Sequence, residues 1–89
     1  MKLTDICEER ILLAEEHVYF GGMTLTYQLR MDRSPVCRRF SVRINMEHEF
    51  DEAEVGTDLM RAVSCYRSLI GGIVTPCALE DAVRHARYA

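Results

Sequence analysis

The sequence predicts an α+β domain: a three- or four-stranded antiparallel β-meander followed by two C-terminal α-helices packed on one face of the sheet. Residues 23–31 alternate between apolar and polar side chains, which is the period of a strand with one buried face. Residues 59–70 carry apolar side chains at helical spacing, and the segment 71–76 contains the glycines and the proline that end one helix and start another. Because the strands precede the helices, one sheet covered by two helices is the simplest arrangement.

The length of 89 residues fits a single domain that spans residues 1–89. The hydrophobic fraction of 48% and the charged fraction of 28% are typical of a folded globular chain. A chain this short buries only about 60–65% of its unfolded surface. A homodimer that hides more apolar area therefore remains open.

The first strands are defined by a glycine pair. Residues 1–14 fit two interpretations equally: Asp5 with Glu8 resembles the capping box of a helix, whereas residues 10–13 fit the start of a strand. The runs 17–20 and 23–27 then flank Gly21-Gly22, which can supply the positive φ of a two-residue hairpin turn. This turn places residue 20 opposite 23, 18 opposite 25 and 16 opposite 27.

Two further strands are expected on the C-terminal side of this hairpin. The strand at residues 23–31 is predicted to be central, and a turn at residues 32–35 leads to a third strand that ends near residue 46. Residues 47–54 form an acidic connection with two interpretations. It contains either a short edge strand running towards Val55 or the start of the first helix, with Asp51 and Glu54 as a capping box. The side chains expected to face the core from the second and third strands are Met23, Leu25, Tyr27, Leu29, Met31, Phe40, Val42, Ile44 and Met46.

The two helices have clear boundaries. Thr57 is the preferred N-cap of the first helix, because Gly56 inside a helix would cost about 1 kcal/mol. Gly71-Gly72 is expected to end this helix with a left-handed residue, after which Thr75 caps the second helix and Pro76 takes its first position. The apolar stripes of the two helices are Leu59, Ala62, Val63, Tyr66, Leu69 and Ile70, and Leu79, Ala82, Val83 and Ala86.

Charge and composition disfavour several classes of protein. The formal net charge of −3 disfavours general nucleic-acid binding. No apolar run approaches the roughly 18–20 residues of a membrane span, and acids stand where a signal peptide would have its apolar core. We therefore expect a cytoplasmic protein without membrane contact. The four cysteines, Cys7, Cys37, Cys65 and Cys77, show no C-x-x-C spacing, so we expect free thiols and no structural zinc.

The polar side of the predicted sheet is the candidate partner-binding surface. Arg30, Arg39, Arg43 and Tyr19 lie on this side and form a locally basic, hydrogen-bonding surface for an anion, an RNA or an acidic protein. An RNA-binding sheet offers two or three stacking aromatics, whereas this face offers Tyr19 alone. A solvated face is the common alternative in antiparallel sheets.

The helix pair gives a second hypothesis, a nucleic-acid-binding regulator. Its spacing loosely fits a helix-turn-helix, with contacts from Arg84, His85 and Arg87. Glu80 and Asp81, however, would repel phosphate where a recognition helix approaches DNA.

The third hypothesis is a thiol-dependent enzyme that uses Cys77, near the start of the last helix, where the helix dipole favours a thiolate. The acidic stretch around His48 lacks the spacing of a calcium loop, and no catalytic or phosphate-binding motif is present. We therefore expect no enzyme, no cofactor and no metal. The leading hypothesis is a small protein-interaction or regulatory module.

Three segments resemble a family of short, uncharacterised bacterial proteins with no assigned activity. In that family a strand meander is followed by a Thr/Asp-capped helix and a short helix with a V-[ST]-P-x-x-L-x-D-V pattern. The matching segments here are residues 27–29, 55–58 and 74–83, and the likeness covers residues 16–88. The chain departs from the family in residues 84–89, which replace an acidic-aromatic end. The resemblance implies this fold and assigns no functional residue.

Overall fold

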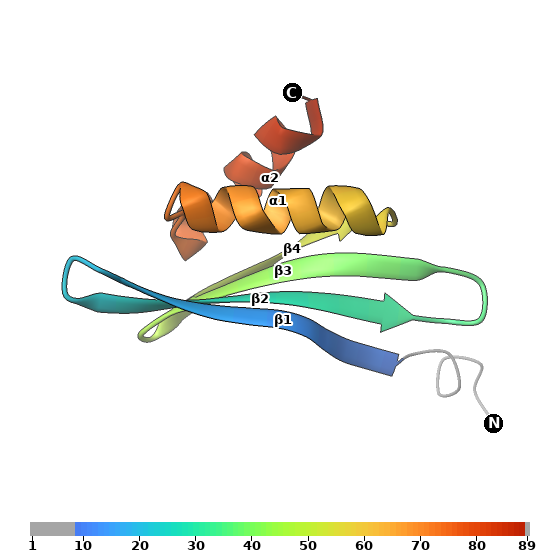
Figure 1. The fold of residues 1–89 in the computed structure, drawn as a ribbon, viewed down its shortest axis with the longest axis horizontal. Helices are drawn as coiled ribbons and strands as arrows, with labels where there is room; N and C mark the ends of the chain where they lie inside the picture. Colours follow the sequence, from blue (N-terminus) through green and yellow to red (C-terminus); the bar gives the residue numbers. More distant parts are fainter. Residues whose placement is uncertain (1–8, 89) are drawn as a thin grey trace.

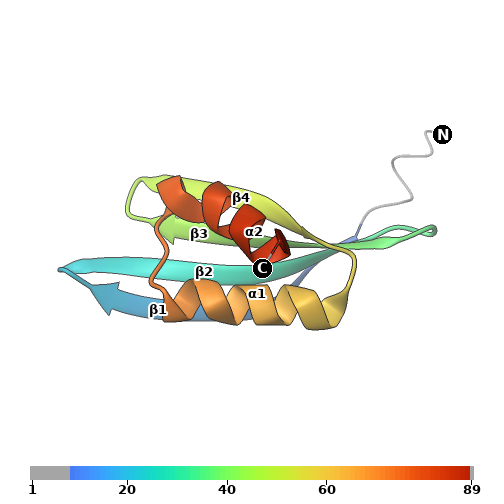
Figure 2. The same ribbon diagram turned by 90° about the horizontal axis from the view of Figure 1, so that it is seen from above.

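The computed structural model describes residues 9–88 and has the predicted α+β architecture (Figure 1). Four strands form one antiparallel meander in the order β1-β2-β3-β4, and α1 and α2 both lie on one face of it. Seen from above, α1 runs along the β1–β2 half of the sheet and α2 lies over the β3–β4 half (Figure 2). The elements are β1 (Glu9–Phe20), β2 (Met23–Arg33), β3 (Arg38–Met46), β4 (Glu49–Gly56), α1 (Leu59–Gly71), the 3-10 helix η2 (Pro76–Ala78) and α2 (Leu79–Tyr88).

The β1–β2 hairpin confirms the predicted turn and register. Gly21 and Gly22 have φ of 61° and 80°, and residues 20, 18 and 16 pair with 23, 25 and 27. Of the two interpretations of residues 1–14, the strand is correct from Glu9 onwards; the capping box at residues 5–8 lies outside the described residues. A bulge between Leu12 and Ala14 leaves Leu13 without a partner on β2.

The acidic segment forms the edge strand β4, and the alternative of a helix starting at Asp51–Glu54 is wrong. Its apolar positions explain the choice, because Ala53 pairs with Val42 on the core side and Val55 is buried. Glu52 and Glu54 lie on the outer face, whereas Glu49 and Asp51 lie on the same side as the core, near the open end of the strand. Strand β4 therefore completes the core while carrying a high negative charge.

The ends of α1 differ in detail from the prediction. Asp58, not Thr57, is the N-cap: its Oδ1 accepts hydrogen bonds from the backbone N–H of Met60 at 2.9 Å and of Arg61 at 3.4 Å. At the other end Gly71 is helical and Gly72 has φ of −88°, so the left-handed residue is Ile73, with φ of 49°. The side chain of Ile73 packs against the core, which offsets the conformational cost of this backbone.

The start of the second helix is close to the prediction. Thr75 is in the N-cap position and Pro76 is the first residue of η2, but the Thr75 side chain makes no capping bond to the backbone. A three-residue 3-10 turn thus precedes α2. Within residues 9–88, no helix has the length and apolar character that a membrane crossing requires.

The core lies between the sheet and the helices, as predicted, with two tyrosines at its centre. The Tyr27 hydroxyl donates to the Val74 carbonyl at 2.9 Å, and the Tyr66 hydroxyl donates to the Tyr27 carbonyl at 3.2 Å. Both buried rings therefore satisfy their polar ends. Leu59 was expected in the stripe but is 45% exposed, and the Ala86 side chain lies outside the described part of the chain. The buried apolar residues are Leu25, Tyr27, Leu29, Phe40, Val42, Ile44, Val55, Ala62, Tyr66, Leu69, Leu79 and Val83.

Candidate functional site

The outer face of the sheet, the side that the helices leave free, holds all four residues predicted to bind a partner. Strand pairing places Arg30 beside Ser41, Gln28 beside Arg43 and Asp32 beside Arg39. Antiparallel partners project to the same side of a sheet, so these side chains share one face. Tyr19 joins them from β1, where it pairs with Thr24.

This face has a balanced charge rather than a basic one. Its four arginines, on β1, β2 and β3, are matched by four carboxylates of the same face. Two of the carboxylates, Glu52 and Glu54, come from β4, which the sequence analysis treated mainly as a connection. The positive character expected from β2 and β3 alone is therefore cancelled by the neighbouring strands. The two sets are Arg10, Arg30, Arg39 and Arg43, and Glu15, Asp32, Glu52 and Glu54.

Arg30 and Arg43 are engaged within the sheet itself. Arg30 Nη2 donates to Gln28 Oε1 at 2.7 Å, and its Nη1 lies 3.6 Å from a carboxylate oxygen of Glu52. Arg43 Nε donates to Asn45 Oδ1 at 3.1 Å, and its guanidinium carbon lies 4.1 Å from the centre of the Phe50 ring. These contacts order the outer face across β2, β3 and β4. Both arginines thus have a structural role before any partner binds.

Ser41 occupies the middle of this network. Only 7% of the residue is exposed, and its Oγ has no hydrogen-bond partner among the described residues. Its pairing neighbours on the outer face are Arg30 and Glu54. Because these side chains are much longer than serine, they shield the hydroxyl from solvent.

Tyr19 and Arg39 lie near opposite ends of the face. Tyr19 pairs with Thr24 at the start of β2, and Arg39 pairs with Asp32 near its end. Eight residues of strand correspond to about 27 Å. The four predicted residues therefore share a face but do not converge on one site.

A projecting hairpin end, residues 32–39, is the strongest candidate for a binding surface, and we call it the arm. It contains the end of β2, the turn and the start of β3, and it extends past the helices in both views (Figures 1 and 2). The turn is well ordered, because the Ser34 hydroxyl donates to the Cys37 carbonyl at 3.1 Å and the Cys37 N–H donates back to Ser34 Oγ at 3.2 Å. Val36 at the tip is 89% exposed.

The arm concentrates positive charge that the rest of the fold does not neutralise. Arg33 and Arg38 are directly paired across the two strands, which is an unfavourable position for like charges. Arg33 binds Glu9 at 2.9 Å, but the guanidinium groups of Arg38 and Arg39 make no hydrogen bond or ion pair with any side chain that the structure describes. The sequence predicts Arg39 as a partner-binding residue and residues 32–35 as a turn. The missed signal was three arginines flanking one turn.

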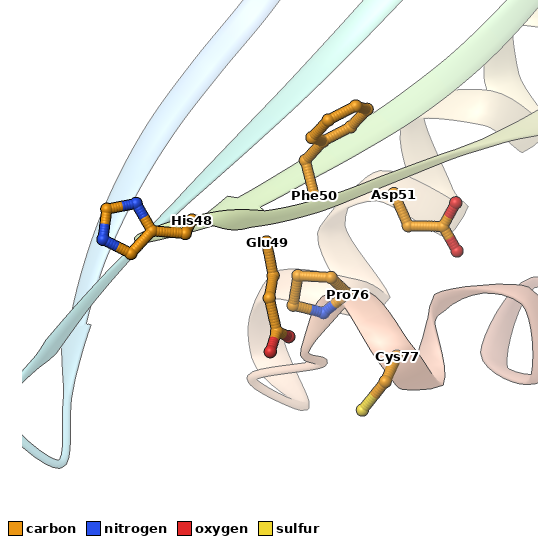
Figure 3. Close-up of a pocket in the computed structure, with 6 residues that line it drawn as sticks. All are labelled: His48, Glu49, Phe50, Asp51, Pro76 and Cys77. Carbon is orange, nitrogen blue, oxygen red and sulfur yellow. The ribbon is translucent and has the colours of Figure 1, made fainter.

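A shallow, open groove lies at the other end of the sheet, beside the β3–β4 turn. Its volume is about 360 Å³, and its lining residues are His48, Glu49, Phe50, Asp51, Pro76 and Cys77. Figure 3 shows Glu49 and Asp51 directed to the side of β4 where Pro76 and Cys77 lie. No lysine or arginine is among these lining residues, so the groove is acidic. We call it the acidic groove.

The acidic groove contains the thiol considered for catalysis. Cys77 is exposed, and its Sγ lies 3.4 Å from Thr75 Oγ1. It lies in the three-residue turn η2 rather than in the first turn of α2, so the expected support from a long helix dipole is weaker than predicted. Among residues 9–88, no group of three histidine, cysteine or acidic side chains is arranged to hold a metal ion.

The helix pair packs on the sheet through its apolar residues. Leu79 and Val83 of α2 are buried, Arg84 lies 4.0 Å from Glu80, and His85 is exposed. The Arg87 side chain lies outside the described part of the chain. The acids Glu80 and Asp81 occupy the first turn of α2, as the sequence indicated. DNA binding by this pair stays a prediction.

Comparison of the chain with models of protein families, with curated proteins and with solved structures finds no significant match. The resemblance to short bacterial proteins therefore stays a prediction, and the function has to be argued from geometry and charge.

Proposed function

We propose that the chain is a small, non-catalytic protein-interaction module that binds an acidic protein through the arm. The observation that carries the proposal is the pair Arg38 and Arg39, whose guanidinium groups have no described partner, beside the exposed Val36 on an ordered, projecting hairpin. Arginine is among the residues that protein interfaces favour, and Val36 adds exposed apolar surface beside the pair. A partner's carboxylates would also offset the repulsion between Arg33 and Arg38.

An acidic protein suits the arm better than a nucleic acid does. Affinity for nucleic acid depends mainly on the number of phosphates neutralised, and the arm offers only three arginines on a molecule of net charge −3. The arm also carries no aromatic side chain for base stacking. A folded acidic protein can bind with a few carboxylates at one place, so three arginines are enough to neutralise them.

The remaining predicted residues have secondary roles in this proposal. Arg39 belongs to the arm, whereas Arg30 and Arg43 stabilise the outer face of the sheet through hydrogen bonds to Gln28 and Asn45. Tyr19 is 81% exposed at the far end of that face and is not part of the binding surface.

The proposal is tested by capturing partners from the native cell with charge-reversed variants. In Arg38→Glu/Arg39→Glu the arm loses the two arginines that have no partner among the described residues. Each charge-assisted hydrogen bond contributes about 1.5–3 kcal/mol, so affinity should fall by at least about tenfold. The matched control is Arg61→Glu/Arg67→Glu, which makes the same charge change at two exposed positions of α1. An arm-bound partner is lost in the first variant and retained in the second. Equal capture by both variants would show that the arm is not the binding surface.

A further inference from the structure

We infer that the acidic partner is a second copy of this chain, and that the arm of one molecule docks in the acidic groove of the next. This inference rests on the proposed function of the arm and names its partner. The structure supplies both halves of the contact on one chain, a cationic projection and an anionic depression. The two halves lie at opposite ends of the sheet (Figures 1 and 2).

The two ends have complementary charges. The arm has a net charge of +2, because residues 32–39 contain three arginines and one aspartate. At the other end, residues 47–51 contain three acids and no lysine or arginine, whereas Glu52 and Glu54 lie further along β4, where they pair with Arg43 and Ser41. The molecule is therefore electrically polar along its 48 Å axis, which favours an arrangement in which copies align head to tail.

The groove contains carboxylates that can bind the arginines of the arm and an apolar residue that can contact its tip. Glu49 makes no hydrogen bond or ion pair with any described side chain, and the one contact of this kind that Asp51 makes within residues 9–88 is the hydrogen bond that its Oδ1 accepts from the N–H of Glu52 at 2.9 Å. These carboxylates are therefore available to the guanidinium groups of Arg38 and Arg39. Pro76 gives the groove an apolar wall against which Val36 can pack.

The contact has to form between molecules. The arm ends at Arg39 in β3 and the groove begins at His48 after β3, so residues 40–46 separate them. Seven residues of strand span about 23 Å, and the arm cannot fold back over that distance. A contact between different surfaces of identical chains is heterologous, so it repeats from copy to copy and produces a ring or an open chain.

The first test measures average molecular mass against protein concentration by analytical ultracentrifugation. An eight-residue arm buries little area, so association is weak and requires concentrated protein. At about 0.02 M salt the average mass of the wild-type chain should rise with protein concentration. At about 0.5 M salt, where charges are screened over a few ångströms, it should stay at the mass of a monomer. A wild-type chain that stays monomeric under both conditions overturns the inference.

The second test exchanges the charges. Arg38→Glu/Arg39→Glu has an acidic arm and an acidic groove, and Glu49→Arg/Asp51→Arg has a basic arm and a basic groove. Each variant alone should remain monomeric at low salt, and an equimolar mixture should regain at least half of the wild-type mass increase. Circular dichroism shows whether each variant is folded. If the groove variant is unfolded, Glu49→Gln/Asp51→Asn replaces it and should weaken wild-type association by about tenfold.

The outcomes separate this inference from the proposed function. If wild-type copies associate but the mixture of variants does not, another surface joins the copies and the arm-to-groove contact is wrong. If wild-type copies never associate but capture of a cellular acidic protein depends on Arg38 and Arg39, the self-association fails and the proposed function stands. If neither self-association nor capture depends on the arm, both fail.

Discussion

The two core tyrosines show how single side chains link the layers of this protein. Tyr27 belongs to the sheet, and its hydroxyl donates a hydrogen bond to the Val74 carbonyl, in the segment after α1. Tyr66 belongs to α1, and its hydroxyl donates a hydrogen bond to the Tyr27 carbonyl in the sheet. Alternation along residues 23–31 predicted the burial of Tyr27. Its partner carbonyl on Val74 is 47 residues away, so no local pattern could indicate it. Long-range polar contacts of this kind depend on how the elements pack.

The burial of these tyrosines makes stability depend on pH. Desolvation raises the pKa of Tyr27 above its ordinary value of 10.0, and desolvation, followed by the charges of Glu16 and Glu15, raises the pKa of Tyr66. Above about pH 10 the unfolded chain loses these protons while the folded chain retains them. The folded state then binds more protons, so the free energy of unfolding falls as pH rises. Burial also raises the pKa of Cys65 above 9.0, which adds to the fall from about pH 9 upwards.

We predict that Tyr66→Phe makes this alkaline loss of stability less steep. Near neutral pH the same variant should be about 1 kcal/mol less stable, because its hydrogen bond to the Tyr27 carbonyl is lost. Urea unfolding at a series of pH values up to and above pH 10 measures both effects. Tyr19→Phe, at an exposed ring, is the control and should follow the wild-type curve. An unchanged alkaline slope in Tyr66→Phe would contradict the account.

At the scale of elements, the sequence predicted most where local chemistry permits few alternatives. Gly21-Gly22 allows a tight turn, and the period of two then fixes the hairpin register residue by residue. The sequence of β4 fits two interpretations, because its acids obscure the core positions Ala53 and Val55. The neutral outer face depends on that strand, so it could not be deduced before the register was known. The arm was only partly anticipated for the same reason: the pairing of Arg33 with Arg38 exists only in the folded sheet.

The start of α1 gives a prediction at the scale of one helix. The side chain of Asp58 satisfies two N–H groups of the first turn, whereas Thr57 precedes the cap. Asp58→Ala should therefore lower the free energy of unfolding by about 1 kcal/mol, and Thr57→Ala should change it by much less. Chemical denaturation of the two variants beside the wild type measures the difference. If Thr57→Ala lowers the free energy of unfolding more than Asp58→Ala does, then Thr57 is the N-cap, as the sequence predicted.

At the scale of the whole molecule, one hydrophobic core joins the sheet to the two helices. The outer face of the sheet contributes a polar network, and the inner face contributes seven of the twelve buried apolar side chains among the described residues; the helices contribute the other five. The helices are therefore half of the single core and not an appended module. This arrangement leaves the arm and the acidic groove as the parts of the fold that are least needed for covering the sheet, which is consistent with a binding role for both.

Leu79 tests whether the two layers are one cooperative unit. It is fully buried at the first residue of α2, where the chain returns to the sheet after η2. Leu79→Ala should cost about 2–5 kcal/mol, a large share of the roughly 5–15 kcal/mol that stabilises a typical domain. The exposed Cys77→Ala, two residues earlier, should cost far less. If the core is shared, far-ultraviolet circular dichroism and tyrosine fluorescence will report one common midpoint in the variant, lower than that of the wild type. If the helical signal is lost at a lower denaturant concentration than the tyrosine signal, the two layers unfold separately. The sheet would then keep its structure without α2.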